Sequence, residues 1–188
     1  MQRLSMLKDL FLINMKMGKI NFSSLNTSFT LKSKTVLRDW ILSVIKKESH
    51  FPGTITYNFC DDKTLLAMNK QYLNHDTYTD ILTFDYGAPF SPGRRAGDEG
   101  FVSWGKVLPS PTPPPFGGGR EGVSGDIFIS IDRIKENANK FNVNFENELH
   151  RVMIHGILHL CGYKDKKKTE KELMRKKEDI YLKQLEKT

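Results

Sequence analysis

The residues best suited to chemistry in this chain are two histidines and an aspartate in its C-terminal third. His155 and His159 are four residues apart, and Asp165 follows six residues after the second histidine. If residues 145–160 are helical, positions i and i+4 project from one face of the helix, so both imidazole rings can bind one cation. Gly162 can adopt the positive φ that ends a helix and turns the chain back, which brings Asp165 within reach as a third ligand.

This ligand set predicts a catalytic metal site. Zinc accepts nitrogen and oxygen ligands, and three protein ligands leave its fourth tetrahedral position for water. The surrounding helix is apolar on nearly every side, so it should be buried, and buried imidazoles need partners. One divalent ion, most readily zinc, would satisfy both rings, although an ordinary helix face also shows this spacing by chance. A bound ion lowers the pKa of its water toward about 7, so metal-bound water could hydrolyse a phosphodiester, with Asp126 as a candidate proton-handling group.

Two known families share parts of this spacing. The pattern His-x3-His-x2-Gly-x2-Asp resembles that of the metzincin peptidases, but Gly156 stands where they carry the glutamate that acts as general base. Residues 155–163, HGILHLCGY, are more similar to the signature HGxLHLxGYDH of the YbeY family of metal-dependent endoribonucleases. Where that signature continues with Asp-His, this chain has Lys164-Asp165, so the third ligand position falls on Asp165.

Two further segments extend the resemblance over most of the chain. Residues 68–84, MNKQYLNHDTYTDILTF, look like the family pattern LNxxYRxxDxxTDVLSF, and residues 125–130, GDIFIS, look like its strand GDIxIS. Leu73 occupies the position of a family arginine that is implicated in RNA cleavage. Lys70 lies one helical turn earlier, and we take it as a candidate RNA contact together with Lys164 and Lys166.

The resemblance implies a single-strand-specific endoribonuclease that acts in ribosomal RNA processing and ribosome quality control. Its implied substrate is the 3′ end of small-subunit ribosomal RNA, and its implied partners are the small subunit and assembly factors. Two alternatives stay open from the residues alone. One is a zinc metallopeptidase that cleaves unstructured peptides, and the other is a ribosome-assembly module with a structural metal, in which Leu73 marks lost catalysis.

Composition narrows the class of protein further. A length of 188 residues favours one domain, and a net charge of +7 favours a polyanionic partner such as RNA. Cys60 and Cys161 are too few for a disulfide scaffold, so we expect reduced core residues. Residues 10–13 form too short an apolar run for a signal segment, and no stretch could span a bilayer. We therefore expect a cytoplasmic protein that has no organic cofactor.

The apolar patterns predict four strands and five helices. The expected strands are 20–26, 53–60, 79–86 and 123–131. The expected helices are 33–48, 61–72, 132–141, 145–161 and 169–185. Together they predict an α+β fold, in which about five helices cover one side of a small mixed four-stranded sheet and the metal site lies on a buried helix.

The domain is expected to run over residues 18–188, after a possible N-terminal extension at 1–17. A segment rich in proline and glycine, about 87–122, interrupts it as a surface insertion, and 109–119 should be extended or disordered. Its arginines and Trp104 suit contact with unpaired bases, but this composition is also typical of a passive linker.

Overall fold

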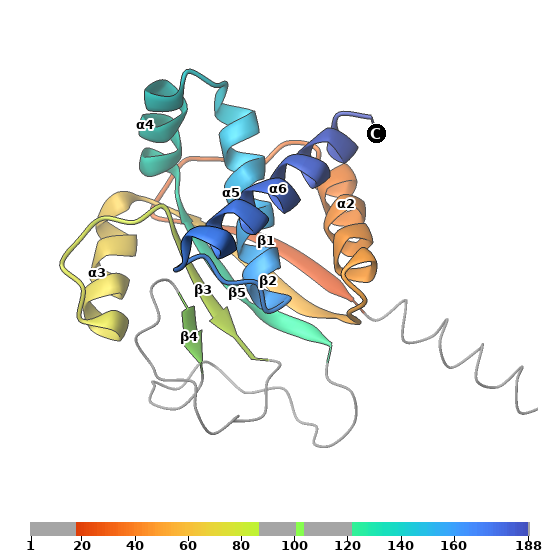
Figure 1. The fold of residues 1–188 in the computed structure, drawn as a ribbon. Coiled ribbons are helices and arrows are strands. Elements are labelled where there is room, and N and C mark those ends of the chain that lie inside the picture. Colours follow the sequence, from red (N-terminus) through yellow and green to blue (C-terminus); the bar gives the residue numbers. More distant parts are fainter. Residues whose placement is uncertain (1–17, 87–100, 104–121, 188) are drawn as a thin grey trace, which may run out of the picture.

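The computed structural model describes residues 18–86, 101–103 and 122–187. Five strands and five helices lie within these ranges (Figure 1). In chain order they are β1 (Lys19–Leu25), α2 (Lys34–Lys47), β2 (Pro52–Cys60), α3 (Asp62–Leu73), β3 (Ile81–Asp85), β4 (Phe101–Ser103), β5 (Val123–Ser130), α4 (Ile131–Phe141), α5 (Phe145–Leu160) and α6 (Lys168–Leu185). The α+β prediction is confirmed, and every predicted strand and helix is present within one residue of its expected bounds, except that β3 begins at Ile81 rather than 79.

The strands form one mixed sheet in the order β1-β2-β5-β3-β4. β1, β2 and β5 are parallel to one another, β3 runs antiparallel to β5, and β4 pairs in parallel with β3 at the edge. The four predicted strands are therefore joined by a fifth short strand from the 87–122 segment, at the edge of the sheet. The remainder of that segment, including Trp104 and 109–119, lies outside the described residues, as do residues 1–17.

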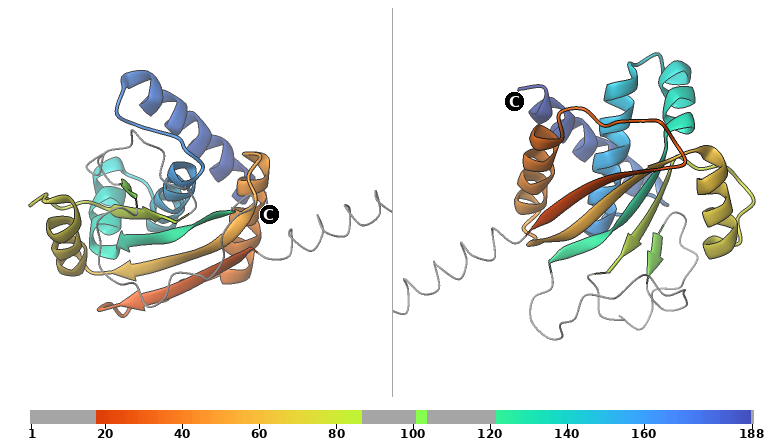
Figure 2. Two further views of the ribbon diagram at one scale, coloured as in Figure 1. Left: turned by 90° about the horizontal axis from the view of Figure 1, so that it is seen from below. Right: turned by 180° about the vertical axis from the view of Figure 1, so that it is seen from behind.

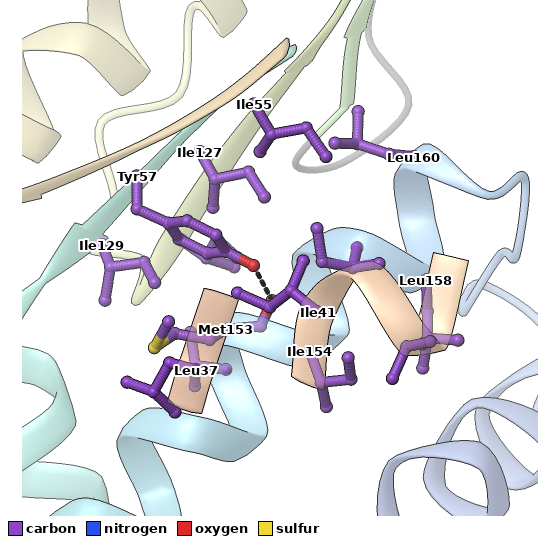
Figure 3. Close-up of a cluster of buried hydrophobic side chains, with 14 of the residues drawn as sticks. Leu37, Ile41, Ile55, Tyr57, Ile127, Ile129, Met153, Ile154, Leu158 and Leu160 are labelled. Carbon is purple, nitrogen blue, oxygen red and sulfur yellow. Dashed lines mark hydrogen bonds between the residues drawn. The ribbon is translucent and has the colours of Figure 1, made fainter. Parts of the chain in front are cut away.

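Helices cover both faces of this sheet. Ile55, Tyr57, Ile127 and Ile129 point from β2 and β5 toward α5 and α2, where they meet the buried faces of those helices (Figure 3). The alternate positions of the strands point the other way and form a second apolar cluster with α3. This second cluster is built from Cys60, Leu65, Leu73 and Leu82. The expectation that the helices cover one side of the sheet is therefore wrong for α3, which packs on the other face. Figure 2 shows α3 set apart from α5 and α6.

The central helix α5 is buried on nearly every side, as its sequence predicts. Asn144 starts it, because its side chain accepts a hydrogen bond from Asn147 N at 2.6 Å. Gly156 faces the sheet so closely that an added Cβ would lie 3.0 Å from both Ile81 and Ile127. Any side chain there would require these two isoleucines to shift, so the glycine permits the close approach of α5 to the sheet.

The chain reverses immediately after α5. Gly162 has φ of +92°, and its N–H donates to the carbonyl of His159 at 2.8 Å. The N–H of Tyr163 donates to the carbonyl of Leu158 at 3.0 Å, which completes a typical helix C-terminal turn. The following residues are thereby directed back toward the histidine face of the helix, as the position of Gly162 predicted.

Both cysteines are reduced and buried, as expected. Burial raises the pKa of Cys60 and of Cys161 to about 12, so neither thiol is a reactive nucleophile near neutral pH. Among the helices in the described ranges, none combines the length and apolar character needed to cross a membrane.

One hydrogen bond joins the sheet directly to α5, and removing it tests this packing. The hydroxyl of fully buried Tyr57 donates to the carbonyl of Met153 at 3.0 Å (Figure 3). We expect Tyr57→Phe to lower the free energy of unfolding by about 1–2 kcal/mol, because a fully buried hydrogen bond between the sheet and α5 is lost. Urea denaturation measures this loss. The matched control Tyr78→Phe removes a hydroxyl from a side chain that is 56% exposed, and should cost about 0.5 kcal/mol or less.

Candidate metal centre

His155, His159 and Asp165 come together at the C-terminal end of α5. One ligand atom from each lies within 4.8 Å of the others. The two Nε2 atoms are 2.9 Å apart, and Oδ2 of Asp165 lies 3.7 Å from Nε2 of His155 and 3.8 Å from Nε2 of His159. The structure therefore places all three predicted ligand atoms around one point, on side chains that are 17%, 11% and 35% exposed.

The outer nitrogens of both rings are already occupied. Nδ1 of His155 lies 2.7 Å from Oε1 of Glu178, and Nδ1 of His159 lies 3.0 Å from the carbonyl oxygen of Tyr163. Carbonyl and carboxylate oxygens only accept, so both Nδ1 atoms carry the proton. Burial, and then the neighbouring His155, lower the pKa of His159, which favours its neutral form. In neutral rings both Nε2 atoms then present lone pairs to each other at 2.9 Å, an arrangement that a shared cation stabilises.

The three atoms also have the spacing that a small divalent ion needs. Their separations of 2.9, 3.7 and 3.8 Å form a triangle with a circumscribed radius of about 2 Å, close to the length of Zn–N and Zn–O bonds. Two imidazole nitrogens and one carboxylate oxygen form a donor set that zinc accepts, and manganese is compatible with it too. The residues therefore fit one divalent ion.

Glu178 supports His155 from the neighbouring helix α6. Its side chain is 4% exposed, and its second oxygen lies 3.6 Å from Arg151. Arg151 also binds the buried carboxylate of Glu148 in a bidentate pair with distances of 2.6 and 2.8 Å. The guanidinium thus offsets the negative charge that Glu178 brings into the interior. A carboxylate behind a ligating histidine fixes the orientation of the ring and raises its basicity.

The histidine motif did not reveal Glu178, although the sequence contains a signal for it. Glu178 shares the buried face of α6 with Met174 and Tyr181, at spacings of four and three residues. An acidic residue on the apolar face of an otherwise basic helix needs a partner inside the protein. The sequence therefore indicates that Glu178 has a partner inside the protein, but it does not identify that partner.

Comparison with known proteins identifies the family of this chain. The sequence model of the family described as Endoribonuclease YbeY matches residues 19–186. The chain belongs to the YbeY endoribonuclease family. The Endoribonuclease YbeY of Flavobacterium psychrophilum is 45% identical over 155 residues, which cover 82% of this chain and 89% of that protein. The Endoribonuclease YbeY of Flavobacterium johnsoniae is 44% identical over 160 residues, covering 85% and 92%.

A solved structure is consistent with the fold of this chain. The solution structure of a Thermotoga maritima protein matches with a TM-score of 0.50 and 22% identity, and the match covers 88% of both chains. The metallopeptidase and the non-catalytic assembly module find no support in these comparisons. The position of Gly156 agrees, because a glutamate general base placed there would face Ile81 and Ile127 in the core.

Asp126 lies apart from the three candidate ligands. It pairs with Phe84 across the sheet, on the face that carries the α3 cluster, and accepts a hydrogen bond from the hydroxyl of Tyr86 at 2.7 Å. Burial, followed by the bond to Asp126, raises the pKa of Tyr86. The structure therefore does not bring Asp126 into contact with the histidine pair.

The remaining site candidates divide between two regions. Lys164 and Lys166 are exposed on either side of Asp165, beside the open edge of the triad. Lys70 lies in the last turn of α3 and forms an exposed ion pair with Asp76 at 2.7 Å. Leu73, at the position of the family arginine, is only 9% exposed and packs among Cys60, Leu65 and Leu82. Its role here is apolar packing.

The support given by Glu178 can be tested through metal affinity. We expect Glu178→Gln to weaken zinc binding about 10–100-fold, because His155 loses a charged acceptor behind the ring while the side chain keeps its shape. Competition with a chromogenic chelator measures the affinity. Glu172→Gln makes the same change at an exposed position of α6 and should leave the affinity unchanged. Equal affinities for both variants would contradict the assigned role.

Proposed function

We propose that this chain is a metal-dependent endoribonuclease specific for single-stranded RNA, with one divalent ion, zinc in the first instance, held by His155, His159 and Asp165. The observation that carries the proposal is the convergence of these three ligand atoms in a chain of the YbeY family. When bound, such an ion polarises a phosphodiester and lowers the pKa of its water toward about 7.

The residues of the chain hold and orient this centre. Glu178 and the carbonyl of Tyr163 fix the two rings with their Nε2 atoms inward. Asp165 is the most exposed of the three ligands, so substrate approaches from the side of the turn and the first residues of α6. Cationic side chains are concentrated there and suit the phosphate backbone of RNA. The exposed ones are Lys164, Lys166, Lys167, Lys168, Lys171 and Arg175.

We further propose that the substrate is ribosomal RNA. The family name supports an RNA substrate, and the net charge of +7 suits a large polyanion such as the small subunit. The 3′ end of small-subunit RNA, ribosome quality control, assembly-factor partners and a cytoplasmic site of action belong to the same proposal. So does the extent of the domain, residues 18–188, since the family match covers 19–186.

Cleavage assays on ligand variants test this function. The parent protein is expected to cut a single-stranded RNA and to lose that activity with a chelator. His159→Ala and Asp165→Ala should reduce cleavage at least about 100-fold together with metal content, because each removes a ligand. His75→Ala, a histidine at the end of α3, is the matched control and should retain both. Cleavage of an unstructured peptide without cleavage of RNA would refute the proposal.

Asp126 remains the proposed proton-handling residue, and its test separates that role from ligation. Asp126→Asn should leave metal affinity unchanged, since its carboxylate is bonded to Tyr86 on the other face of the sheet. General acid–base groups contribute about 100-fold or more to rate. A loss of cleavage of about 10-fold or more would therefore support proton handling by Asp126. Cleavage at the parental rate would remove Asp126 from the catalytic residues.

Leu73 gives a further test of how this chain differs from the family pattern. Leu73→Arg is expected to lower stability by about 1–3 kcal/mol without raising RNA cleavage, because the new charge enters an apolar cluster. Leu73→Met keeps the volume and should cost less than about 1.5 kcal/mol. Activity that appears only in Leu73→Arg would instead show that the parent is a binding module.

A further inference from the structure

Glu48 is a buried carboxylate in an unfavourable place. It directly follows the last residue of α2, and its side chain is 6% exposed. The C-terminal end of a helix carries partial negative charge, so an acid there is repelled, and burial penalises its ionised form further. An acid at this position destabilises the protein unless strong partners compensate, so the identity of those partners is informative.

Three donors from two other segments surround this carboxylate. The ammonium of Lys177 lies 2.8 and 3.1 Å from its two oxygens, and the hydroxyl of Tyr163 donates to it at 2.7 Å. The hydroxyl of Tyr181 donates to it as well. Burial raises the pKa of Glu48, but these hydrogen bonds outweigh it and leave the pKa below its usual value. Glu48 is therefore ionised at neutral pH.

Tyr163 connects this cluster to the metal centre. Its hydroxyl binds Glu48, while its carbonyl accepts the Nδ1 proton of His159 at 3.0 Å. The ammonium of Lys177 lies 5.2 Å from the centre of its ring. Tyr163 thus joins Glu48, from which it is 115 residues distant in sequence, to a ligand of the triad. It also stands two residues before Asp165, in the same turn.

The turn is held by these polar contacts as well as by the packing of Cys161 and Tyr163 with the core. Gly162 itself is exposed, and a Cβ added to it would meet no atom within 4 Å, so this one position adds no side-chain packing to the turn. The backbone bonds of Gly162 and Tyr163 close the turn onto α5. The phenol of Tyr163, bound to Glu48, fixes the direction in which the turn then continues toward Asp165.

We propose that Glu48 is a positioning residue for the metal triad. By anchoring the phenol of Tyr163 and the ammonium of Lys177, it holds the 161–165 turn in place. Asp165 and His159 then face the same point as His155. Glu48 touches neither the ion nor the substrate. The inference rests on the proposed function in one respect, that the triad binds a divalent ion.

Metal affinity and the cobalt spectrum test this role. Co²⁺ replaces zinc as the probe, because its visible absorption reports the coordination geometry directly, while chelator competition gives the affinity. We expect Glu48→Gln to weaken Co²⁺ and Zn²⁺ binding about 10–100-fold, the range for residues that support metal ligands, and to change the Co²⁺ spectrum. Asp39→Asn is the matched control: it neutralises an exposed acid on the same helix and should change neither readout.

A second variant keeps the test decisive if Glu48→Gln folds poorly. Tyr163→Phe removes the hydroxyl that binds Glu48 and also contacts Lys177, and it preserves both the ring and the carbonyl that binds His159. It should weaken metal binding in the same direction and alter the same spectrum. In an Asp165→Ala background the effect of Tyr163→Phe should be smaller, because part of its effect is exerted through that ligand.

The possible outcomes separate the two proposals. Unchanged affinity and spectrum in Glu48→Gln or, if that variant does not fold, in Tyr163→Phe would overturn the positioning role, even if the melting temperature fell. A parent that binds neither Co²⁺ nor Zn²⁺ would overturn the metal site of the proposed function and the positioning role with it. A parent that binds metal and loses affinity in both variants supports the role of Glu48, whatever its activity on RNA.

Discussion

The hydrogen bonds at the outer nitrogens of His155 and His159 set the rest of the site. Each Nδ1–H donates a hydrogen bond to a fixed acceptor, so each Nε2 lone pair points inward. The two Nε2 atoms lie 2.9 Å apart. One acceptor is the carbonyl of Tyr163 and the other is the carboxylate of Glu178 from α6. Ring orientation therefore depends on the turn after α5 and on how α6 packs across it.

Placing a carboxylate behind a histidine brings a negative charge into the interior, and the surrounding side chains supply partners for that charge. Glu178 lies near Arg151, which is itself held by Glu148 on the same helix. Glu48 is held in the same way by Lys177 and two tyrosines. Buried charges left without partners would each cost several kcal/mol, so these pairings make the polar interior compatible with a stable fold.

The position of α5 against the sheet explains why the histidines reach the edge of the molecule. Gly156 allows close contact with Ile81 and Ile127, and the neighbouring buried residues of α5 pack against β2, β5 and α2. His155 and His159 lie on the remaining sector of the helix, toward α6 and the turn. Acidic groups thus face inward around the triad, while exposed lysines surround Asp165 and give the open side a charge suited to RNA.

Local periodicity was enough to predict each described helix, every described strand except β4, and the three candidate ligands. The i, i+4 spacing places His155 and His159 on one face of any helix, and Gly162 is suited to the turn that returns Asp165. The alternation in β5 also shows that Asp126 and Ile127 point to opposite faces, but not which face meets α5. Which face that is depends on how the helices pack, because helices cover both faces of the sheet.

The contacts between distant segments likewise follow from the packing of the whole fold. Glu48 and Glu178 come from α2 and α6, and the way these helices cross α5 follows from packing of the whole core rather than from any local pattern. The three-residue strand β4 is too short to produce a recognisable alternation, so its pairing with β3 could not be predicted. Residue spacing determines local geometry, whereas the partners of a buried charge depend on which surfaces the fold brings together.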